Sequence, residues 1–314
     1  MSLKFAMQQG AKPKVWLSMC GLVMASALTG CGETETDPTS PTTDNGVVDN
    51  IDYTPSTTPD ETSTIPVVRG LAIADTGITW GANYPEGNND TVEGNRCIGE
   101  TVAQQDCLNG RDNYAATGQL TKVGTGEAGF DYTRVNSDGS LNIGSGDYIS
   151  SPWSCVLDNV TGLLWEVKTP QHGSDIHTAS DLYAWLNTDN TVNGGTAGSE
   201  GGATCVGYSS TDANTFCNTE AYVARVNARG LCGFNDWRLP TKQELESIVN
   251  YGTYRPATSL SHFPHTLPVD YWTSQAVSTV NSASWVVNFD FGKSVSISDR
   301  GGQPSAIRLV RDAN

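Results

Sequence analysis

The stretch 236-DWRLPTKQELESIVNYG-252 specifies a corner at which an extended segment turns into a helix. The residue that precedes a proline is disfavoured in the helical region, so the chain up to Pro240 is predicted to be extended. Thr241 and Glu244 have the spacing of a capping box, in which each side chain accepts a hydrogen bond from the backbone N–H of the other residue. A helix is therefore predicted to begin at Thr241.

The residues after this start signal have the period of an amphipathic helix. Apolar side chains three and four residues apart form one buried face, and they are Leu245, Ile248 and Val249. Gly252 is suited to the left-handed conformation that ends many helices, which gives a helix of about three turns. Replacing Thr241 by alanine is expected to cost about 1 kcal/mol, and replacing Glu244 somewhat less.

The first thirty residues are predicted to be a signal peptide. Three lysines precede an apolar run at 15–28 that is too short to span a bilayer as a mature helix. The run closes with Leu28-Thr-Gly-Cys31, which resembles the lipobox of bacterial lipoproteins. That resemblance implies cleavage before Cys31 and attachment of a diacylglycerol to its thiol. The alternative is an ordinary secretory signal followed by a chance cysteine.

Gly32, and not an aspartate, follows the predicted lipidation site. In lipoproteins of this kind an aspartate there commonly favours retention in the inner membrane. The resemblance therefore implies a bacterial cell-envelope protein that is anchored in the outer membrane. Several acyl chains hold a protein on a bilayer far more firmly than one chain does, so the membrane is an expected partner through the N-terminal lipid.

Residues 32–66 have the composition of a tether. They contain ten threonines, five prolines, eight acidic residues and no lysine or arginine. Such a segment has too few large apolar side chains to offset the entropy lost on folding. The predicted organisation is a lipoprotein signal peptide at 1–30, a lipidated cysteine with a disordered tether at 31–66, and a folded domain at 67–314.

The folded domain is acidic. The chain has 18 basic and 34 acidic residues, and removal of the signal peptide takes away three lysines and leaves a net charge of −19. Without the eight acidic residues of the tether, the folded domain carries −11. Such a surface repels phosphate backbones and other polyanions, so nucleic acid is not expected as a partner. The sequence carries no signal for an oligomeric state.

Six cysteines remain once Cys20 in the signal peptide and Cys31 are set aside. An even number in an exported chain favours disulfides over metal binding or catalysis. Proximity in sequence favours two local bonds and leaves one long-range bond, and the pairs are Cys97 with Cys107, Cys205 with Cys217, and Cys155 with Cys232. Six cysteines allow fifteen connectivities, so other pairings stay open.

Short strands and helices are predicted around the corner. Runs of apolar and β-branched residues and alternation of apolar with polar residues predict strands at 155–158, 163–167, 285–291, 294–297 and 306–310. Helices are predicted at 178–187, with Leu182, Trp185 and Leu186 inward, and at 219–229, with Tyr222, Val223 and Val226 inward and Gly230 at the end.

Several motifs have the order and spacing of the Lcl C-terminal domain family. They are Asp158-Asn-Val-Thr-Gly-Leu-Leu-Trp-Glu166, Gly233-Phe-Asn-Asp-Trp-Arg-Leu-Pro-Thr-Lys-Gln-Glu-Leu245, Tyr271-Trp-Thr-Ser274, Trp285-Val-Val-Asn-Phe-Asp-Phe-Gly292 and Ile307-Arg-Leu-Val-Arg311. Residues 155–314 resemble the core of that family. Residues 67–154 look like an extension found in some of its members.

The corner is also similar to that of formylglycine-generating-enzyme-like domains. That similarity implies a C-type-lectin-like α+β fold, in which two or three helices pack on a small twisted antiparallel sheet with long loops, stapled here by disulfides. In such a fold Trp237 and Leu239 are expected to pack inward. Arg238 is expected to be held by a carboxylate or by backbone carbonyls.

The family's occurrence in adhesins implies a lectin-like module that binds glycan or protein ligands. The charge of −11 favours a neutral glycan or a protein over a sulfated polysaccharide. Asp236-Trp-Arg238 fits either a ligand patch or a structural corner, and capping and burial favour the corner. Trp165, Trp272 and Trp285 are predicted to be core residues and not a platform for sugars.

Signals for catalysis or metal binding are weak. His172, His177, His262 and His265 lack the helical spacing and the neighbouring cysteines of zinc sites. Calcium is the one cofactor left open, through the oxygen-rich loop Asn187-Thr-Asp-Asn190. The alternative function is an envelope enzyme of the formylglycine-generating-enzyme-like fold. Such an enzyme needs a reactive cysteine pair, whereas disulfides are predicted here.

Overall fold

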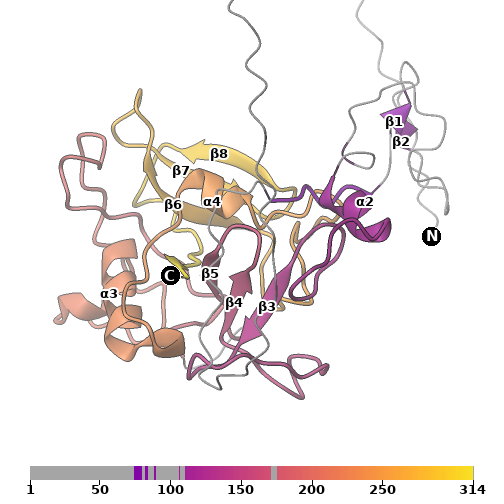
Figure 1. Ribbon diagram of the computed structural model, residues 1–314. Coiled ribbons are helices and arrows are strands. Elements are labelled where there is room, and N and C mark those ends of the chain that lie inside the picture. The colour runs from indigo at the N-terminus through magenta and orange to yellow at the C-terminus, as the bar shows by residue number, and fades with distance from the viewer. Residues whose placement is uncertain are drawn as a thin grey trace, which may run out of the picture. The chain divides into compact units, whose positions relative to one another are not determined.

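The computed structural model describes residues 74–79, 82–83, 88–89, 106, 110–170 and 175–313 (Figure 1). All of them belong to one unit, Asp60–Asn314, and the other unit, Met1–Pro59, lies outside the described residues. The predicted signal peptide, the lipidation site Cys31, the tether and the bond between Cys97 and Cys107 also lie outside them. No helix within the described part of the chain is long and apolar enough to span a membrane.

A four-stranded antiparallel sheet contains the first predicted strand pair. Its order is β3 (Tyr132–Val135), β4 (Cys155–Asp158), β5 (Leu163–Glu166) and β9 (Val310–Asp312). The turn between β4 and β5 is as predicted, and Gly162 supplies its left-handed backbone with φ of 71°. Every residue of β4 and β5 is buried, so this part of the sheet is covered on both faces.

A three-stranded antiparallel sheet consists of β6 (Asp270–Ala276), β7 (Ser284–Asn288) and β8 (Lys293–Ile297). The alternation predicted at 285–291 is only partly right. Val286 is buried as completely as Val287, whereas Phe291 is 55% exposed, because the strand ends before the turn that carries Phe291.

The predicted strand at 306–310 is mostly wrong. Only Val310 belongs to β9, while Ala306 forms an isolated bridge with Tyr271 of β6. This segment therefore crosses from one sheet to the other instead of extending a single strand.

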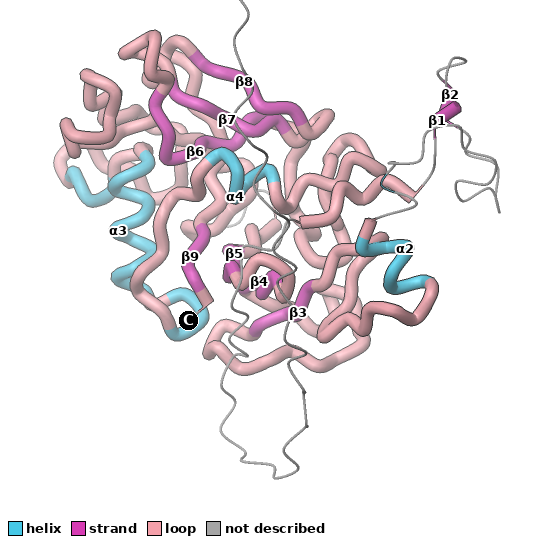
Figure 2. The backbone as a smooth tube through the Cα atoms, turned by 45° about the horizontal axis from the view of Figure 1, so that its top comes forward, coloured by secondary structure: helices cyan, strands magenta, loops and turns pink. Residues whose placement is uncertain are grey.

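The corner 236–242 also joins the two sheets. The backbone of Arg238 exchanges two hydrogen bonds of 3.0 Å with Val310 of β9, and the carbonyl of Pro240 accepts from the N–H of Ser274 in β6 at 2.7 Å. The chain then enters α4 (Lys242–Glu246), which lies between β6 and the strands β5 and β9 in Figure 2. The corner thus ties together two sheets that share no strand.

The capping box at the start of α4 is confirmed. Thr241 Oγ1 accepts from the N–H of Glu244 at 3.2 Å, and Glu244 Oε2 accepts from the N–H of Thr241 at 2.7 Å. The predicted end is wrong, because α4 stops after five residues and Gly252 has no left-handed backbone. The N–H of Asn250 bonds to the carbonyl of Ala257 at 3.1 Å, so pairing with a later segment ends the helix early. The predicted apolar face is buried throughout at Leu245, Ile248 and Val249.

The helix predicted at 219–229 is confirmed as α3 (Thr219–Arg229). The side chain of Asn218 accepts from the N–H of Ala221 at 2.8 Å, and Gly230 ends the helix with φ of 67°. Tyr222 and Val226 are buried on its inner face.

The helix predicted at 178–187 is wrong. Tyr183, Ala184 and Trp185 are all buried in succession, which no amphipathic helix allows. Their N–H groups bond to carbonyls of other segments, at Ser305, Cys217 and Arg300 respectively, with distances of 2.9 Å. Tertiary pairing therefore replaces the local helical hydrogen bonds here.

The remaining elements are short. They are the pair β1 (Ala82–Asn83) and β2 (Asn88–Asn89), the helix α2 (Arg111–Ala116) and the 3₁₀ turns η1 (Ala213–Thr215) and η2 (Leu231–Gly233). The described residues therefore form a mixed α and β structure with two small antiparallel sheets, few helices and long loops.

Two of the three predicted disulfides are formed within the described residues. Cys155 bonds to Cys232 and Cys205 bonds to Cys217. The first bond joins β4 to the turn just before the corner and is buried in a core cluster with Trp237. It closes a sequence separation of 77 residues, so it links the two ends of the region that contains α3.

Candidate ligand-binding site

Arg238 and Glu244 fix the geometry of the corner. The guanidinium donates two hydrogen bonds to the Glu244 carboxylate, with N–O distances of 2.7 and 2.8 Å. Burial raises the pKa of Glu244, but the hydrogen bonds from Arg238 and from the N–H of Thr241 outweigh it and hold the pKa below its ordinary value. The carboxylate of Glu244 therefore both caps α4 and pairs with Arg238. Of the two expected kinds of partner for Arg238, a carboxylate or backbone carbonyls, the carboxylate makes the short hydrogen bonds.

Asp236 and Trp237 also have internal partners. Asp236 accepts from Nε of Arg311 at 2.6 Å, and this hydrogen bond lowers the pKa of the carboxyl. Trp237 is 1% exposed and donates from its indole N–H to the carbonyl of Leu231 at 3.0 Å. Neither face of this indole is open to a ligand, so Trp237 has a structural role in the corner, whereas Arg238 also lines a neighbouring cleft.

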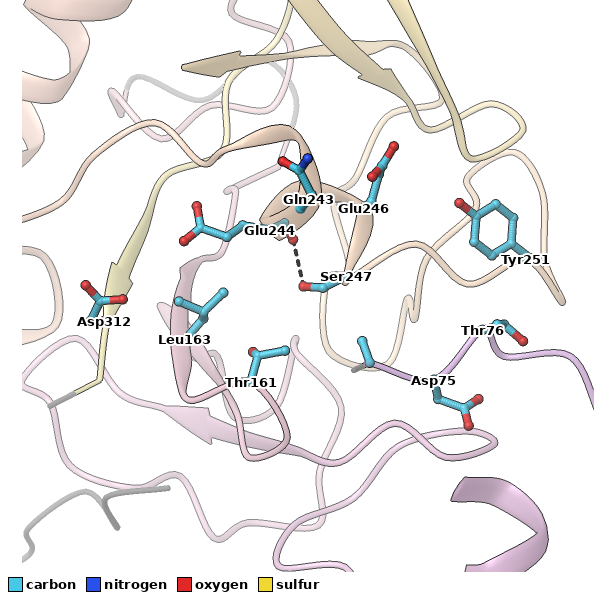
Figure 3. Close-up of a pocket in the computed structure, with 11 residues that line it drawn as sticks. Asp75, Thr76, Thr161, Leu163, Gln243, Glu244, Glu246, Ser247, Tyr251 and Asp312 are labelled. Atoms are coloured by element: carbon cyan, nitrogen blue, oxygen red, sulfur yellow. Dashed lines mark hydrogen bonds between the residues drawn. The ribbon is translucent and has the colours of Figure 1, made fainter. Parts of the chain in front are cut away.

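A cavity of about 500 Å³ opens beside α4 (Figure 3). Its wall comes from α4 and the turn after it, from the start of β5, from Asp312 of β9 and from residues 74–76. The N–H of Tyr251 bonds to the carbonyl of Thr76 at 2.9 Å, which fixes 74–76 against the loop after α4. A volume of this size lies in the range of small-molecule sites. We call this cavity the acidic pocket.

The centre of the acidic pocket is apolar with small hydroxyl groups. Leu163 forms part of its wall, and the hydroxyl groups come from Thr161 and Ser247 (Figure 3). Thr161 donates to Asp158 at 2.7 Å and Ser247 donates to the carbonyl of Glu244 at 2.6 Å. The oxygen atoms of both hydroxyl groups therefore remain able to accept a hydrogen bond from a ligand.

The carboxylates around the acidic pocket point away from its centre. In Figure 3 the carboxylate of Glu246 points toward the three-stranded sheet, where it accepts from the hydroxyl of Ser294. Asp75 points toward α2 and accepts from the N–H of Gly77 at 2.8 Å. Asp312 is 3.5 Å from Arg238. These groups give the rim a negative potential without forming a pair for acid and base catalysis.

Exposed aromatic side chains lie on the loop after α4 and on the turn after β7, two segments that are joined by a hydrogen bond from the N–H of Arg255 to the carbonyl of Asp290. Tyr251 lines it and is 46% exposed, while Tyr254 and Phe291 are 72% and 55% exposed. Arg255 lies 5.5 Å from the centre of the Phe291 ring, and its Nε is 3.0 Å from Asp290. Exposed aromatic side chains are typical of binding surfaces. We call Tyr251, Tyr254 and Phe291 the aromatic patch.

The tryptophans predicted to be core residues differ from one another. Trp165 and Trp272 are fully buried, as predicted. Trp285 is only partly buried and lines a different cleft together with Lys242. The prediction for Trp285 is therefore wrong, because the strand that carries it turns this side chain toward solvent.

Two of the four candidate histidines have clear structural roles. His177 Nδ1 lies 2.7 Å from Oε1 of Glu166, which also accepts from Lys168 and Tyr222. Burial raises the pKa of Glu166, but the positive charge of Lys168 and these hydrogen bonds hold it far below its ordinary value. This network is closed to solvent and stabilises the core between β5 and α3.

His262 lies in a cluster that resembles a catalytic arrangement only in composition. Ser259 and Ser261 both donate to the carboxylate of Glu127, so His262 Nδ1, about 3 Å from each serine, acts as the donor. Its Nε2 faces the hydroxyl of Thr125 at 3.0 Å. Burial lowers the pKa of His262 to about 4. This imidazole cannot take a serine proton, and it instead holds the loop at 259–262 against 125–127.

Those remaining candidates that the structure describes are not grouped into a metal site. His172 lies outside the described residues, and His265 packs edge-on against Tyr148 at 4.7 Å between ring centres. In the loop 187–190, Asn187 and Asp189 accept from backbone N–H groups within the loop. Within 74–79, 106, 110–170 and 175–313, no three His, Cys, Asp or Glu side chains are grouped closely enough to hold a metal ion.

The sequence reasoning missed Gln243, Tyr251, Tyr254 and Phe291 as surface residues. Tyr251 belongs to the segment 236–252, but a single aromatic residue near the end of a helix gives no periodic pattern that would predict its exposure. The exposed positions depend on the early end of α4 and on the turn after β7, which are both tertiary features.

The fold and the pocket define a mixed α and β domain, stapled by disulfides, with a ligand-sized cavity at a capped corner. The family model for the Lcl C-terminal domain matches residues 154–311, about half of the 314-residue chain. The chain therefore belongs to this family, as the motifs predicted. Comparisons with curated proteins and with solved structures find no match.

Proposed function

We propose that this chain is a lipid-anchored protein of the bacterial cell envelope whose folded domain binds glycan or protein ligands. The observation that carries the proposal is the acidic pocket together with the aromatic patch. A cavity of about 500 Å³ with the exposed ring of Tyr251 in its wall offers both a recess and a contact surface, and Tyr254 and Phe291 add two more exposed rings to the domain. The ligand reaches the domain from solvent, and the lipid on Cys31 holds the domain at the outer membrane.

The charge of the domain narrows the ligand class. The rim of the acidic pocket contains Glu244, Glu246 and Asp312, and the domain carries −11. Polyanions are repelled by such a surface, whereas neutral or basic groups are not. A neutral glycan or a basic protein segment is therefore the ligand class that the acidic pocket suits, and nucleic acid is not.

The fold supports a lectin-like reading of this domain. The similarity of the corner implies a small antiparallel sheet with two or three helices and long loops, and the small antiparallel sheets, the helices α3 and α4 and the long loops are compatible with that fold. Catalysis has little support. The four described cysteines are in disulfides, and the cluster at His262 has its hydrogen bonds in the wrong direction for a nucleophilic serine.

The test is a binding screen on the full chain in detergent micelles, against a glycan array and a panel of envelope proteins, with a hydrolysis screen in parallel. We expect ligands without turnover. Tyr251→Ala is expected to weaken binding about tenfold, since aromatic anchors carry much of the energy of an interface. Tyr114→Ala is the matched control, because Tyr114 is 42% exposed on α2 and does not line the pocket. Turnover of a substrate, or equal effects of the two substitutions, would contradict the proposal.

A further inference from the structure

Trp285 differs from every other tryptophan that the structure describes. The other five are at most 2% exposed, and they are Trp153, Trp165, Trp185, Trp237 and Trp272. Trp285 lies on β7 and lines a cleft of about 550 Å³ that is separate from the acidic pocket and shares only Gln243 with it. The ammonium group of Lys242 lies 5.1 Å from the centre of its ring, which orients the indole. We call this the Trp285 cleft.

Several hydrogen-bond donors on the side chains that line the Trp285 cleft have no acceptor among the residues that the structure describes. The indole N–H of Trp285 and the side-chain amide of Gln243 have no hydrogen-bond partner among the described residues. Gln275 and Asn187 each use the side-chain oxygen, which accepts from the N–H of Lys242 at 3.0 Å and of Asp189 at 2.9 Å respectively. Their NH₂ groups remain unused within the described ranges.

The backbone fixes these donors in place. The pairing of β6 with β7 is irregular between Trp272 and Ala276, and this irregularity positions Ser274 and Gln275 at the cleft. Asn187 is held by its N–H to the carbonyl of Ala197 at 2.8 Å. The donors are therefore preorganised, which reduces the entropy lost when a ligand binds.

The chemical groups that line the Trp285 cleft favour one type of ligand. Unused N–H donors require an acceptor-rich partner, such as carbonyl and hydroxyl oxygens. An aromatic side chain offers a large contact area for the apolar face of a sugar ring. The one positive charge, on Lys242, lies 3.8 Å from Glu246, so the cleft does not need an anionic ligand to balance it.

We propose that the Trp285 cleft binds a neutral N-acetylated sugar, whose ring packs against Trp285 and whose acetamido carbonyl accepts from Gln275 and Asn187. This site goes beyond the function proposed for the acidic pocket, although both cavities border Gln243. A neighbouring cleft shares Asn187 and Ser274 with the Trp285 cleft, so a ligand of more than one ring has room to extend.

The test uses the full chain in detergent micelles and titration calorimetry with the β-1,4-linked trimer of N-acetylglucosamine. The glucose trimer lacks the acetamido groups, and trigalacturonic acid adds carboxylates. We expect the acetylated trimer to bind and the glucose trimer to bind at least about tenfold more weakly, because it lacks the acetamido oxygen that accepts from both Gln275 and Asn187.

Gln275→Glu tests the donor most directly. It keeps the side-chain oxygen that accepts from the N–H of Lys242 and replaces the unused NH₂ group by a carboxylate oxygen. It is expected to weaken binding of the acetylated trimer about tenfold, and Trp285→Leu at least as much. Tyr114→Ala is the control, since Tyr114 lies on α2 and lines neither cavity, and Tyr251→Ala serves to separate this cleft from the acidic pocket. Circular dichroism and thermal unfolding check that each variant is folded.

The inference is overturned if the acetylated trimer does not bind, or if the folded variants Gln275→Glu and Trp285→Leu bind it as tightly as the wild type does. Stronger binding of trigalacturonic acid also overturns it, because the ligand class is then anionic. If Tyr251→Ala abolishes binding of the trimer while Gln275→Glu and Trp285→Leu do not, the sugar binds in the acidic pocket instead. If the trimer does not bind but a ligand from the glycan array does, and Tyr251→Ala weakens its binding, the proposed function is supported and the Trp285 cleft is not a sugar site.

Discussion

Arg238→Ala tests whether the corner is structural. In the wild type the guanidinium makes two hydrogen bonds to Glu244, and the side chains are 39% and 20% exposed. A fully buried pair would lose about 3–5 kcal/mol when one partner is removed, and an exposed pair about 0.2–1 kcal/mol. This pair lies between those limits, so we expect a loss of about 1–2 kcal/mol from the free energy of unfolding.

Glu244→Ala is expected to cost more than Thr241→Ala. Glu244 accepts from Arg238 and also from the N–H of Thr241, whereas Thr241 contributes one cap of about 1 kcal/mol. The sequence alone ranked these two substitutions in the opposite order. The reversal follows from the second role of Glu244 as the partner of Arg238.

A double-mutant cycle on Arg238 and Glu244, measured by urea unfolding and tryptophan fluorescence, isolates their interaction. We expect a coupling of about 1 kcal/mol, since both single changes remove the same ion pair. A coupling near zero would show that the pair contributes nothing. If Arg238→Ala left the unfolding midpoint unchanged while it abolished ligand binding, the corner would be a recognition site and the structural interpretation would be refuted.

Three further predictions concern other parts of the chain. Burial raises the pKa of Asp158 to about 6, so its protonation stabilises the fold below the unfolded pKa of about 4 and this contribution is lost as the pH rises through 6. Asp158→Asn should therefore gain about 3 kcal/mol relative to wild type between pH 4 and pH 7, and a difference that does not vary with pH would contradict the burial argument. Replacing Cys155 and Cys232 by alanine should lower the free energy of unfolding by about 4–5 kcal/mol, and replacing Cys205 and Cys217 by about 3 kcal/mol. The first bond spans 77 residues and the second 12, and the loop-closure entropy grows with this separation. Equal urea midpoints for the two variants would contradict this explanation. Cys31→Ser should release the protein from membranes or block its processing, and a processed variant that stays bound through a detergent-free wash would disprove the anchor.

Local signals in the sequence specified the elements that depend on neighbouring residues. The capping box of Thr241 and Glu244, the strand pair β4 and β5 with its glycine turn, and α3 with Gly230 at its end all formed where predicted. In each case the hydrogen bonds that define the element join residues only a few positions apart. The sequence is therefore sufficient for such elements.

The tertiary structure alone fixed the elements whose backbone bonds to distant segments. Tyr183, Ala184 and Trp185 pair with segments far along the chain, so a helical pattern did not produce a helix there. The segment after α4 also bonds to a distant part of the chain, because the N–H of Tyr251 donates to the carbonyl of Thr76 at 2.9 Å.

The candidate sites depend on tertiary structure even more strongly. The acidic pocket combines residues 74–76, β5, α4 and β9, and the Trp285 cleft combines α4 with β6, β7 and the loop at Asn187. A sequence pattern shows which side chains an element contributes, but a cavity forms where separate elements meet. The packing of the two sheets around the corner therefore decided which aromatic residues became core and which became surface.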